Sequence, residues 1–273
     1  MGIRRFQVWS LLLLSPILLT ACGGLEKEIV VPQPPYDRQL VVECYLEAGK
    51  PFRLALSESV EYLASPELPA ITDATVQLSY DDQREKIPFK PVVDTANRKV
   101  YNYALDSPLP GNLDQAYTLE ITDPKGRRVT GTTRFPSPVR IKELSWEFGD
   151  RDRAYLIVRF DDPPDTEDYY RFVVTRDSLG GSVEENFTFD DRFATNNEIT
   201  LGTNYDYKDG DPIIVTLFHI DKAYFDFIQS TNDAANANGN PFGQPSQIKS
   251  TVSGGIGVFT ALAYDRRTVV VKK

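Results

Sequence analysis

Apolar and polar residues alternate in many segments after residue 38, and this period of two is typical of strands with one buried face. Turn residues separate the segments. The stretch Asp-Pro-Lys-Gly at 123–126 is typical of a hairpin, because Pro124 fixes φ and Gly126 tolerates positive φ. About six strands at this spacing predict an antiparallel sandwich. They are expected at residues 39–47, 52–59, 74–81, 99–105, 116–123 and 127–135.

One of these strands carries a more specific signal. Leu109-Pro110-Gly111 precedes Tyr117, after which Leu119 and Ile121 alternate with polar residues. This arrangement resembles the tyrosine corner of immunoglobulin-like and fibronectin-like sandwiches, where a Tyr hydroxyl bonds to nearby backbone. An aromatic residue at an ordinary strand start is the alternative. We therefore expect an immunoglobulin-like β-sandwich at residues 39–136.

The second half of the chain predicts another β-rich domain at residues 137–273. Pro136 and Pro138 mark the boundary. A helix is expected near 221–236, with Asp221 as its N-cap. Its core face would comprise Tyr224, Phe225, Phe227 and Ile228. Residues 254–271 predict a closing pair of strands, and earlier strands are expected at 141–148, 154–163, 168–176, 185–191 and 212–220.

The first residues follow a different pattern. Arg4 and Arg5 precede an apolar run from Val8 to Leu19 that contains Pro16. A membrane-spanning helix needs roughly 20 apolar residues, so this run is too short. The basic start, the short apolar core and the small residues that follow predict a secretory signal peptide at residues 1–21.

Leu19-Thr20-Ala21-Cys22 resembles the bacterial lipobox, which implies cleavage before Cys22 and acylation of its sulfur and its new amino end. Several acyl chains give stable anchoring, because each buried methylene adds about 0.8 kcal/mol. Residues 22–38 are rich in Gly, Pro and charge, and they predict an extended, lipid-anchored tether.

Charge and cysteine content narrow the possible partners. Without Arg4 and Arg5, 28 basic residues remain against 39 acidic ones, a net charge of −11. This balance disfavours binding to nucleic acid and to anionic lipid heads. Cys44 is the only cysteine besides Cys22, so acylation of Cys22 excludes an intrachain disulfide. Cys44 is expected to be an inert buried thiol, and an intermolecular partner is the alternative.

Candidate catalytic chemistry is sparse. His219 is the only histidine, it lies in an apolar strand, and no nucleophile-elbow pattern accompanies any serine, so a structural role is favoured. Acidic residues could act as paired catalytic carboxylates or bind calcium, but they cluster where turns are expected, which favours solvated turns. We therefore predict no catalytic residue, no metal site, no cofactor and no enzymatic activity. The acidic residues are Asp150, Asp152, Asp161, Asp162, Asp165, Glu167, Asp168, Asp190, Asp191, Asp206, Asp209 and Asp211.

Aromatic residues are a further candidate for binding. Exposed rings form sugar- or protein-binding faces, whereas rings in strands more often pack across strands. The residues concerned are Tyr101, Tyr103, Tyr169, Tyr170, Tyr205, Tyr207 and Trp146.

Both ends of the chain carry a family resemblance. The segment from Cys22 through the strand Leu40-Val41-Val42-Glu43-Cys44, and the later aromatic helix, Asn-Pro loop and Gly-Gly-x-Gly-x-Phe strand, resemble a lipoprotein family of Bacteroidota. This is domain-of-unknown-function family 4249. The resemblance implies an outer-membrane lipoprotein, often encoded beside a TonB-dependent receptor, and it transfers no catalytic residue.

Two smaller motifs go with this resemblance. Gly23-Gly24-Leu25-Glu26-Lys27-Glu28 is loosely like the signal that sends such lipoproteins to the cell surface. Residues 94–96 and 177–179 resemble the O-glycosylation motif of the phylum, with Thr95 and Ser178 as the acceptors.

Three functions are compatible with the sequence. The leading expectation is a non-enzymatic accessory or binding subunit of a TonB-dependent outer-membrane transport complex, in contact with a barrel protein. The alternative is a free-standing carbohydrate- or peptide-binding surface lipoprotein. The third is a hydrolase that uses paired carboxylates such as Asp161 or Asp190.

Overall fold

The structure is a computed structural model that describes residues 36–61, 68–149, 151–238 and 246–273. Residues 38–273 form one compact unit, to which the following description refers. The predicted signal peptide, Cys22 and the tether up to residue 35 lie outside the described residues.

The main element is an eight-stranded sheet with the order β12-β11-β14-β16-β1-β2-β6-β5. All of its pairings are antiparallel except that of β1 with β16, which is parallel. In chain order the strands are β1 (Leu40–Glu47), β2 (Pro51–Glu58), β5 (Phe89–Asp94), β6 (Lys99–Pro108), β11 (Tyr169–Arg176), β12 (Val183–Asp190), β14 (Pro212–Ile220) and β16 (Ile256–Val270).

Two smaller sheets accompany it. A five-stranded sheet has the order β15-β8-β7-β3-β4, and a three-stranded sheet has the order β13-β10-β9. The former comprises β3 (Thr75–Tyr80), β4 (Gln83–Ile87), β7 (Ala116–Thr122), β8 (Arg128–Arg134) and β15 (Val252–Ser253). The latter comprises β9 (Ile141–Phe148), β10 (Ala154–Asp161) and β13 (Glu198–Gly202). The described helices are α2 (Lys222–Asn238) and the short 3₁₀ helix η2 (Asp191–Phe193).

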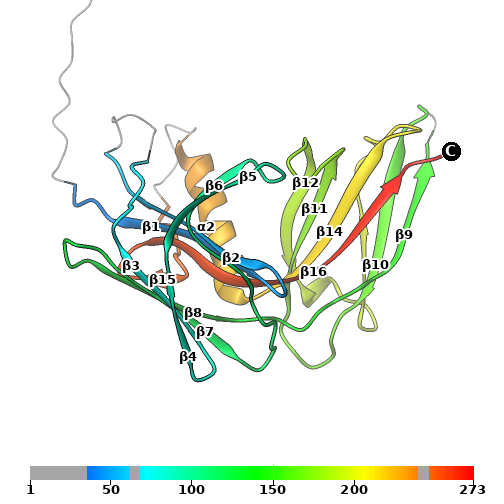
Figure 1. Cartoon of the computed structure of the whole chain (residues 1–273). Helices are drawn as coiled ribbons and strands as arrows, with labels where there is room; N and C mark the ends of the chain where they lie inside the picture. Colours follow the sequence, from blue (N-terminus) through cyan, green and yellow to red (C-terminus); the bar gives the residue numbers. More distant parts are fainter. Residues whose placement is uncertain (1–35, 62–67, 150, 239–245) are drawn as a thin grey trace, which may run out of the picture. The chain divides into compact units, whose positions relative to one another are not determined.

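Two hydrophobic clusters join the small sheets to the large one. In the first, Leu54 of β2 and Phe259 of β16 pack with Leu119 of β7. In the second, Phe172 of β11 and Leu217 of β14 pack with residues of β9, β10 and β13. Two sandwiches therefore share one sheet, and Figure 1 shows β16, in orange to red, passing from beside β1 to beside β14.

The predicted fold class is confirmed: the described part of the chain is mainly β, with antiparallel sandwich sheets, a second β-rich part and one α-helix. Alternation explains why the strands form. In β1 the residues alternate strictly between buried and half-buried, so one face packs in a core and the other does not. Four described strands were not predicted, namely β4, β5, β13 and β15.

The closing segment differs from the prediction. Residues 254–271 were expected to form a pair of strands, and this was wrong, because β16 is a single strand of 15 residues. Its charged stretch does not turn, since its charges find partners on β9 and β14. Asp265 accepts a hydrogen bond from the Ile141 backbone nitrogen at 3.0 Å, and Arg266 Nε donates to Thr216 Oγ1 at 3.0 Å.

The predicted domain boundary at residues 136–137 lies between the two clusters in sequence. Phe259 and Ala261, from the last strand, nevertheless belong to the cluster that otherwise comprises residues of the first half and Val252. The first sandwich thus needs a strand from the chain's far end.

The helix prediction is confirmed. The Asp221 carboxylate accepts a hydrogen bond from the Tyr224 backbone nitrogen at 2.7 Å, which is an N-cap. Tyr224 is buried, and Phe225, Phe227 and Ile228 pack against a third, smaller cluster on the sheet. The helix therefore lies against the face of the eight-stranded sheet that the two main clusters do not use.

The tyrosine corner is also confirmed. Tyr117 is fully buried, and its hydroxyl donates a hydrogen bond to the Pro110 carbonyl. Burial raises the pKa of Tyr117, so the hydroxyl remains a donor at neutral pH. This bond ties the loop before β7 to the core.

The first prediction concerns this corner. Tyr117→Phe should lower the free energy of unfolding by about 1–2 kcal/mol, because it leaves the Pro110 carbonyl without its partner. Urea denaturation measures the change. Tyr205→Phe, at an exposed tyrosine with no hydroxyl bond in the described chain, is the matched control and should have no measurable effect.

The predicted hairpin at 123–126 is confirmed and is held by ion pairs. Gly126 has φ +83°, and its nitrogen donates to the Asp123 carbonyl at 3.0 Å. Glu58, at the end of β2, contacts Lys125 at 2.9 Å and Arg127 at 2.8 Å. Arg38 lies 3.3 Å from the same carboxylate. Hydrogen bonds from Lys125 and these guanidinium groups lower the pKa of Glu58 to about 2.

This lowered pKa predicts an acid-dependent loss of stability. The unfolded carboxyl titrates near 4.5, so the stabilisation is complete above that pH and is lost as the pH falls towards 2. Glu58→Gln should cost about 1.5–3 kcal/mol at neutral pH, and the cost should shrink in acid. Chemical denaturation at several pH values measures it. Glu143→Gln, at an exposed pair with Arg159, is the control and should show the same dependence of stability on pH as the wild type. If Glu58→Gln also shows the wild-type dependence, Glu58 is not the group responsible for the acid-dependent loss.

Candidate binding groove

A groove of about 600 Å³ lies on the face of the eight-stranded sheet that the two main clusters leave free. All eight strands contribute at least one lining residue, and α2 contributes Tyr224. The volume is within the range of small-molecule sites, about 300–1,000 Å³. The alternation that buries one face of each strand thus leaves the other face to form this groove.

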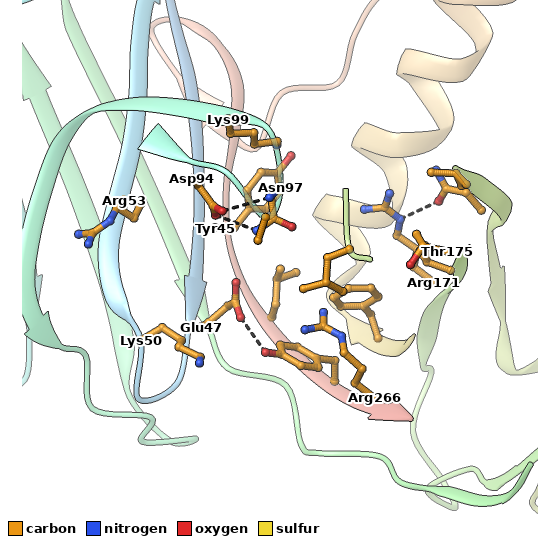
Figure 2. Close-up of a pocket in the computed structure, with 18 of the residues that line it drawn as sticks. Tyr45, Glu47, Lys50, Arg53, Asp94, Asn97, Lys99, Arg171, Thr175 and Arg266 are labelled. Carbon is orange, nitrogen blue, oxygen red and sulfur yellow. Dashed lines mark hydrogen bonds between the residues drawn. The ribbon is translucent and has the colours of Figure 1, made fainter. Parts of the chain in front are cut away.

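Charge in the groove is opposite to that of the whole protein. The chain has a net charge of −9, whereas the lining comprises five cationic residues and two carboxylates. The cationic residues are Lys50, Arg53, Lys99, Arg171 and Arg266; the carboxylates are Glu47 and Asp94. The guanidinium of Arg53 turns away from the other labelled side chains in Figure 2 and donates to the backbone carbonyls of Phe52 and Leu105.

Arg171, on β11, is held by neutral groups. Its Nε donates to Asn186 Oδ1 at 2.9 Å, and its Nη1 donates to the Tyr224 hydroxyl at 2.9 Å. Its guanidinium carbon lies 5.9 Å from the ring centroid of Phe218. No carboxylate of the described chain pairs with it. Its position is therefore fixed while its charge is not neutralised.

Arg266, on β16, is held in the same way. Its guanidinium carbon lies 4.5 Å from the Tyr264 ring centroid, and its Nε bonds Thr216. It too lacks a carboxylate partner among the described residues. The ammonium of Lys99, by contrast, pairs with Glu43 and lies 4.9 Å from the Tyr45 ring centroid.

The groove phenols and acids have defined hydrogen-bonding roles. Burial raises the pKa of Tyr45 and Tyr224, and it raises the pKa of Tyr101 to about 12, so these phenols stay neutral. The Tyr264 hydroxyl donates to Glu47 at 2.8 Å. Hydrogen bonds from Asn97 lower the pKa of Asp94, which keeps this carboxylate charged.

One buried polar atom in the groove lining has no partner. Thr175, on β11, is only 5% exposed, and its Oγ1 makes no hydrogen bond in the described structure. Thr216, on the neighbouring strand, is 3% exposed but accepts from Arg266. An unpaired buried hydroxyl is costly, so Thr175 indicates a position where a ligand atom would supply the missing bond.

The groove is bounded by two turns that meet. A Cβ on Gly180 would lie 2.4 Å from the Ala96 carbonyl oxygen, so the turn after β11 touches the turn after β5. Thr95 and Ser178, the predicted glycosylation acceptors, lie exposed on these two turns. Their modification stays a prediction.

His219 lies outside the groove, in a separate cluster. It is buried and stacks on Tyr170, with centroids 5.2 Å apart. Its Nδ1 lies 2.7 Å from the Ser137 carbonyl, so Nδ1 donates, and its Nε2 lies 2.9 Å from Asp168 Oδ1. A histidine with both ring nitrogens bonded inside the fold fits the predicted structural role.

Three of the twelve acidic residues come together beside His219. Asp162, Asp168 and Asp191 place ligand atoms within 4.8 Å of one another. Donors within the fold already serve them: the Tyr170 hydroxyl reaches Asp162 at 2.6 Å, and the Asp168 nitrogen reaches Asp191 at 3.1 Å. Burial raises the pKa of Asp162. Asp161 and Asp190, the carboxylates considered for hydrolysis, instead pair with Lys142 and Arg192.

The predicted aromatic residues have several different positions. Tyr101 alone among them lines the groove. Tyr103, Tyr170 and Tyr207 belong to the main clusters and Tyr169 to the third. Tyr205 is 56% exposed, and Trp146 Nε1 donates to the Lys272 carbonyl at 2.7 Å.

Cys44 is a free, fully buried thiol, as predicted, and burial raises its pKa. Within the described residues, no helix has the length and apolar character needed to cross a membrane.

The fold defines a β-sandwich protein with a groove on one face of its largest sheet. The chain belongs to the family described as "Domain of unknown function (DUF4249)", whose model matches residues 26–268. This confirms the resemblance to domain-of-unknown-function family 4249. A search of curated proteins found no significant match.

Several solved structures share similarity at low identity. A segment of two fibronectin type III domains from chicken tenascin is 12% identical, with 87% of this chain and all of that chain covered and a TM-score of 0.26. A cytokine receptor complex is 8% identical, with 85% and 95% covered and a TM-score of 0.30. A DUF4785 family protein from Legionella pneumophila is 13% identical, with 66% and 52% covered and a TM-score of 0.25.

Sequence reasoning missed the main groove residues, including Arg171, Arg266 and Thr175. A signal was present for Arg171, because it interrupts an otherwise apolar and aromatic strand. No signal could show that β11 and β16 lie on either side of β14, which is what brings Arg171 and Arg266 onto one surface.

The unpartnered hydroxyl of Thr175 predicts that its removal stabilises the protein, whereas most substitutions of buried residues destabilise it. Thr175→Val should raise the free energy of unfolding by up to about 1 kcal/mol, because it removes a buried polar atom without a partner. Thr216→Val is the matched control and should lower it by a similar amount, because Arg266 loses an acceptor. Urea denaturation of both variants measures the effect, and a clear loss of stability in Thr175→Val would contradict the unpartnered state.

Proposed function

We propose that this protein is a non-enzymatic outer-membrane lipoprotein, an accessory or binding subunit of a TonB-dependent transport complex. Acyl chains on Cys22 attach it to the membrane, facing the cell exterior, and residues 22–38 tether the compact unit. The lipobox-like sequence at 19–22 and the tether-like composition of residues 22–38 support this location. The barrel partner is proposed from the resemblance of the chain to its family.

The observation that carries the binding role is the groove. Its lining comes from all eight strands of one sheet, so it is formed by the fold itself and needs no rearrangement. Arg171 and Arg266 are held in place by neutral neighbours. Groups fixed before a ligand arrives lose less freedom on binding, which favours affinity.

A free-standing carbohydrate- or peptide-binding surface lipoprotein is the second candidate. The groove favours it in one respect: every lining residue belongs to the compact unit 38–273, and the site is complete without a second chain. The two candidates differ in whether a barrel protein accompanies the lipoprotein in its membrane.

Affinity purification from native membranes distinguishes them. The tagged full-length protein should recover a TonB-dependent barrel protein in near-equal amount, measured by quantitative mass spectrometry. Cys22→Ser is the control for anchoring and should leave the membrane fraction, whereas Cys44→Ala, at the other cysteine, should remain in it. Recovery of the membrane-bound protein without any barrel would exclude the transport-complex role and favour the second candidate.

A further inference from the structure

We propose that the groove binds an acidic saccharide, a short chain of sugar rings that carries carboxylate or sulfate groups. This inference rests on the proposed binding function and adds the class of ligand. It is independent of whether a barrel protein is the partner.

Unpaired positive charge is the first support. Arg171, Arg266 and Lys50 line the groove, and none of the three forms an ion pair within the described chain. The protein as a whole is strongly acidic and has carboxylates available for its other cations. Cations left without carboxylates inside a groove lower the free energy of a bound anion.

The positions of the two arginines on the sheet suit an extended ligand. Arg171 pairs with Phe218, and Phe218 pairs with Tyr264, two residues from Arg266 on the same face. Strand spacing and rise place the Cα atoms of the two arginines roughly 12 Å apart. A chain of sugar rings spans this Cα separation.

Aromatic rings between the charges match sugar rings. Phe218 lies 5.4 Å from Tyr264, centroid to centroid, and both line the groove between the two arginines. The C–H faces of a pyranose are apolar and pack on aromatic rings, while its hydroxyls point outward to polar groups. Rings and cations that lie close together in one groove therefore suit a saccharide with charged substituents.

Acceptors in the groove separate a saccharide from a simple anion. Sugar hydroxyls both donate and accept, and Glu47, Asp94 and the Asn97 side chain offer acceptors at the rim. Carboxylates accept hydrogen bonds from hydroxyl groups, which a saccharide has and a simple anion lacks. The unpartnered Thr175 Oγ1 supplies both a donor and an acceptor.

Main-chain recognition of a peptide is disfavoured here. The six inner strands of the sheet each lie between two hydrogen-bonded neighbours, so their backbone groups are already used. Peptides that bind sheets usually add a strand at a free edge. A ligand on this face is recognised through side chains alone, as saccharides are.

A glycan array with the detergent-solubilised full-length protein tests the class. The array should carry carboxylated, sulfated and neutral oligosaccharides. Binding of a glutamate-rich peptide should be measured in the same experiment. We expect binding to the carboxylated oligosaccharides, the sulfated ones or both. Comparing the two identifies which acidic group the protein recognises. Titration calorimetry then compares oligogalacturonate with its methyl ester, which has the same sugar chain without the carboxylate charges. The ester should bind at least about tenfold more weakly. Added salt should weaken the acidic interaction.

Variants then locate the site. Arg171→Gln combined with Arg266→Gln should lower the affinity at least about tenfold, and Thr175→Val should lower it several-fold in a protein that remains folded by circular dichroism. If the double variant does not fold, Lys50→Gln, in an exposed turn, replaces it and should also weaken binding. Arg159→Gln, at an exposed position on β10, is the matched control and should bind normally.

Three results would overturn the inference: no acidic saccharide binds, the neutral forms bind equally well, or the groove variants keep full affinity. Preferential binding of the glutamate-rich peptide would overturn the saccharide class as well. Loss of the barrel partner in the membrane purification leaves this test unaffected, so the two proposals fail separately.

Discussion

Strand β16 lies between β14 and β1, and this position gives both hydrophobic clusters a common sheet. Its parallel pairing with β1 covers seven positions, from Val41 with Ile256 to Glu47 with Leu262. The pairing needs Gly257, which has φ +124° and whose Cβ, if present, would lie 1.9 Å from the Val42 oxygen. Because these strands come from opposite ends of the described chain, their pairing carries a large loop-closure entropy. The first sandwich is therefore complete only after residues 256–270 have been synthesised.

Much of the fold could be predicted because alternation and turn chemistry are local. The strands that bury one face, such as β1 and β10, were recognisable, as were the Asp221 cap and the Tyr117 corner. Strands β4 and β5 were missed because they are mostly exposed, and so they lack the apolar period on which the prediction depends. The continuous β16 was missed for a different reason: its charges looked like a turn, and their partners, Ile141 and Thr216, come from other strands.

The groove could not be predicted, because it depends on strand order and not on any local motif. Arg171 and Arg266 belong to strands separated by β14, and a sequence alone does not state that order. Charged residues on half-buried faces look like ordinary solvent-exposed positions until their neighbours are known. What they share is physical: each is ordered by an aromatic ring and a neutral hydrogen-bonding group, and each keeps its charge available for a ligand.

The turn that contains Gly180 contacts the turn that contains Ala96, and both turns adjoin edge strands of the large sheet. These turns belong to the hairpins that contain β12 and β5, the two edge strands of the large sheet. Free edges pair readily with other chains and so promote aggregation. On β5, Pro91 removes a backbone donor and Lys90 adds charge, which makes this edge a poor template for pairing. The β5 edge of the large sheet thus offers a second copy of the chain little on which to polymerise.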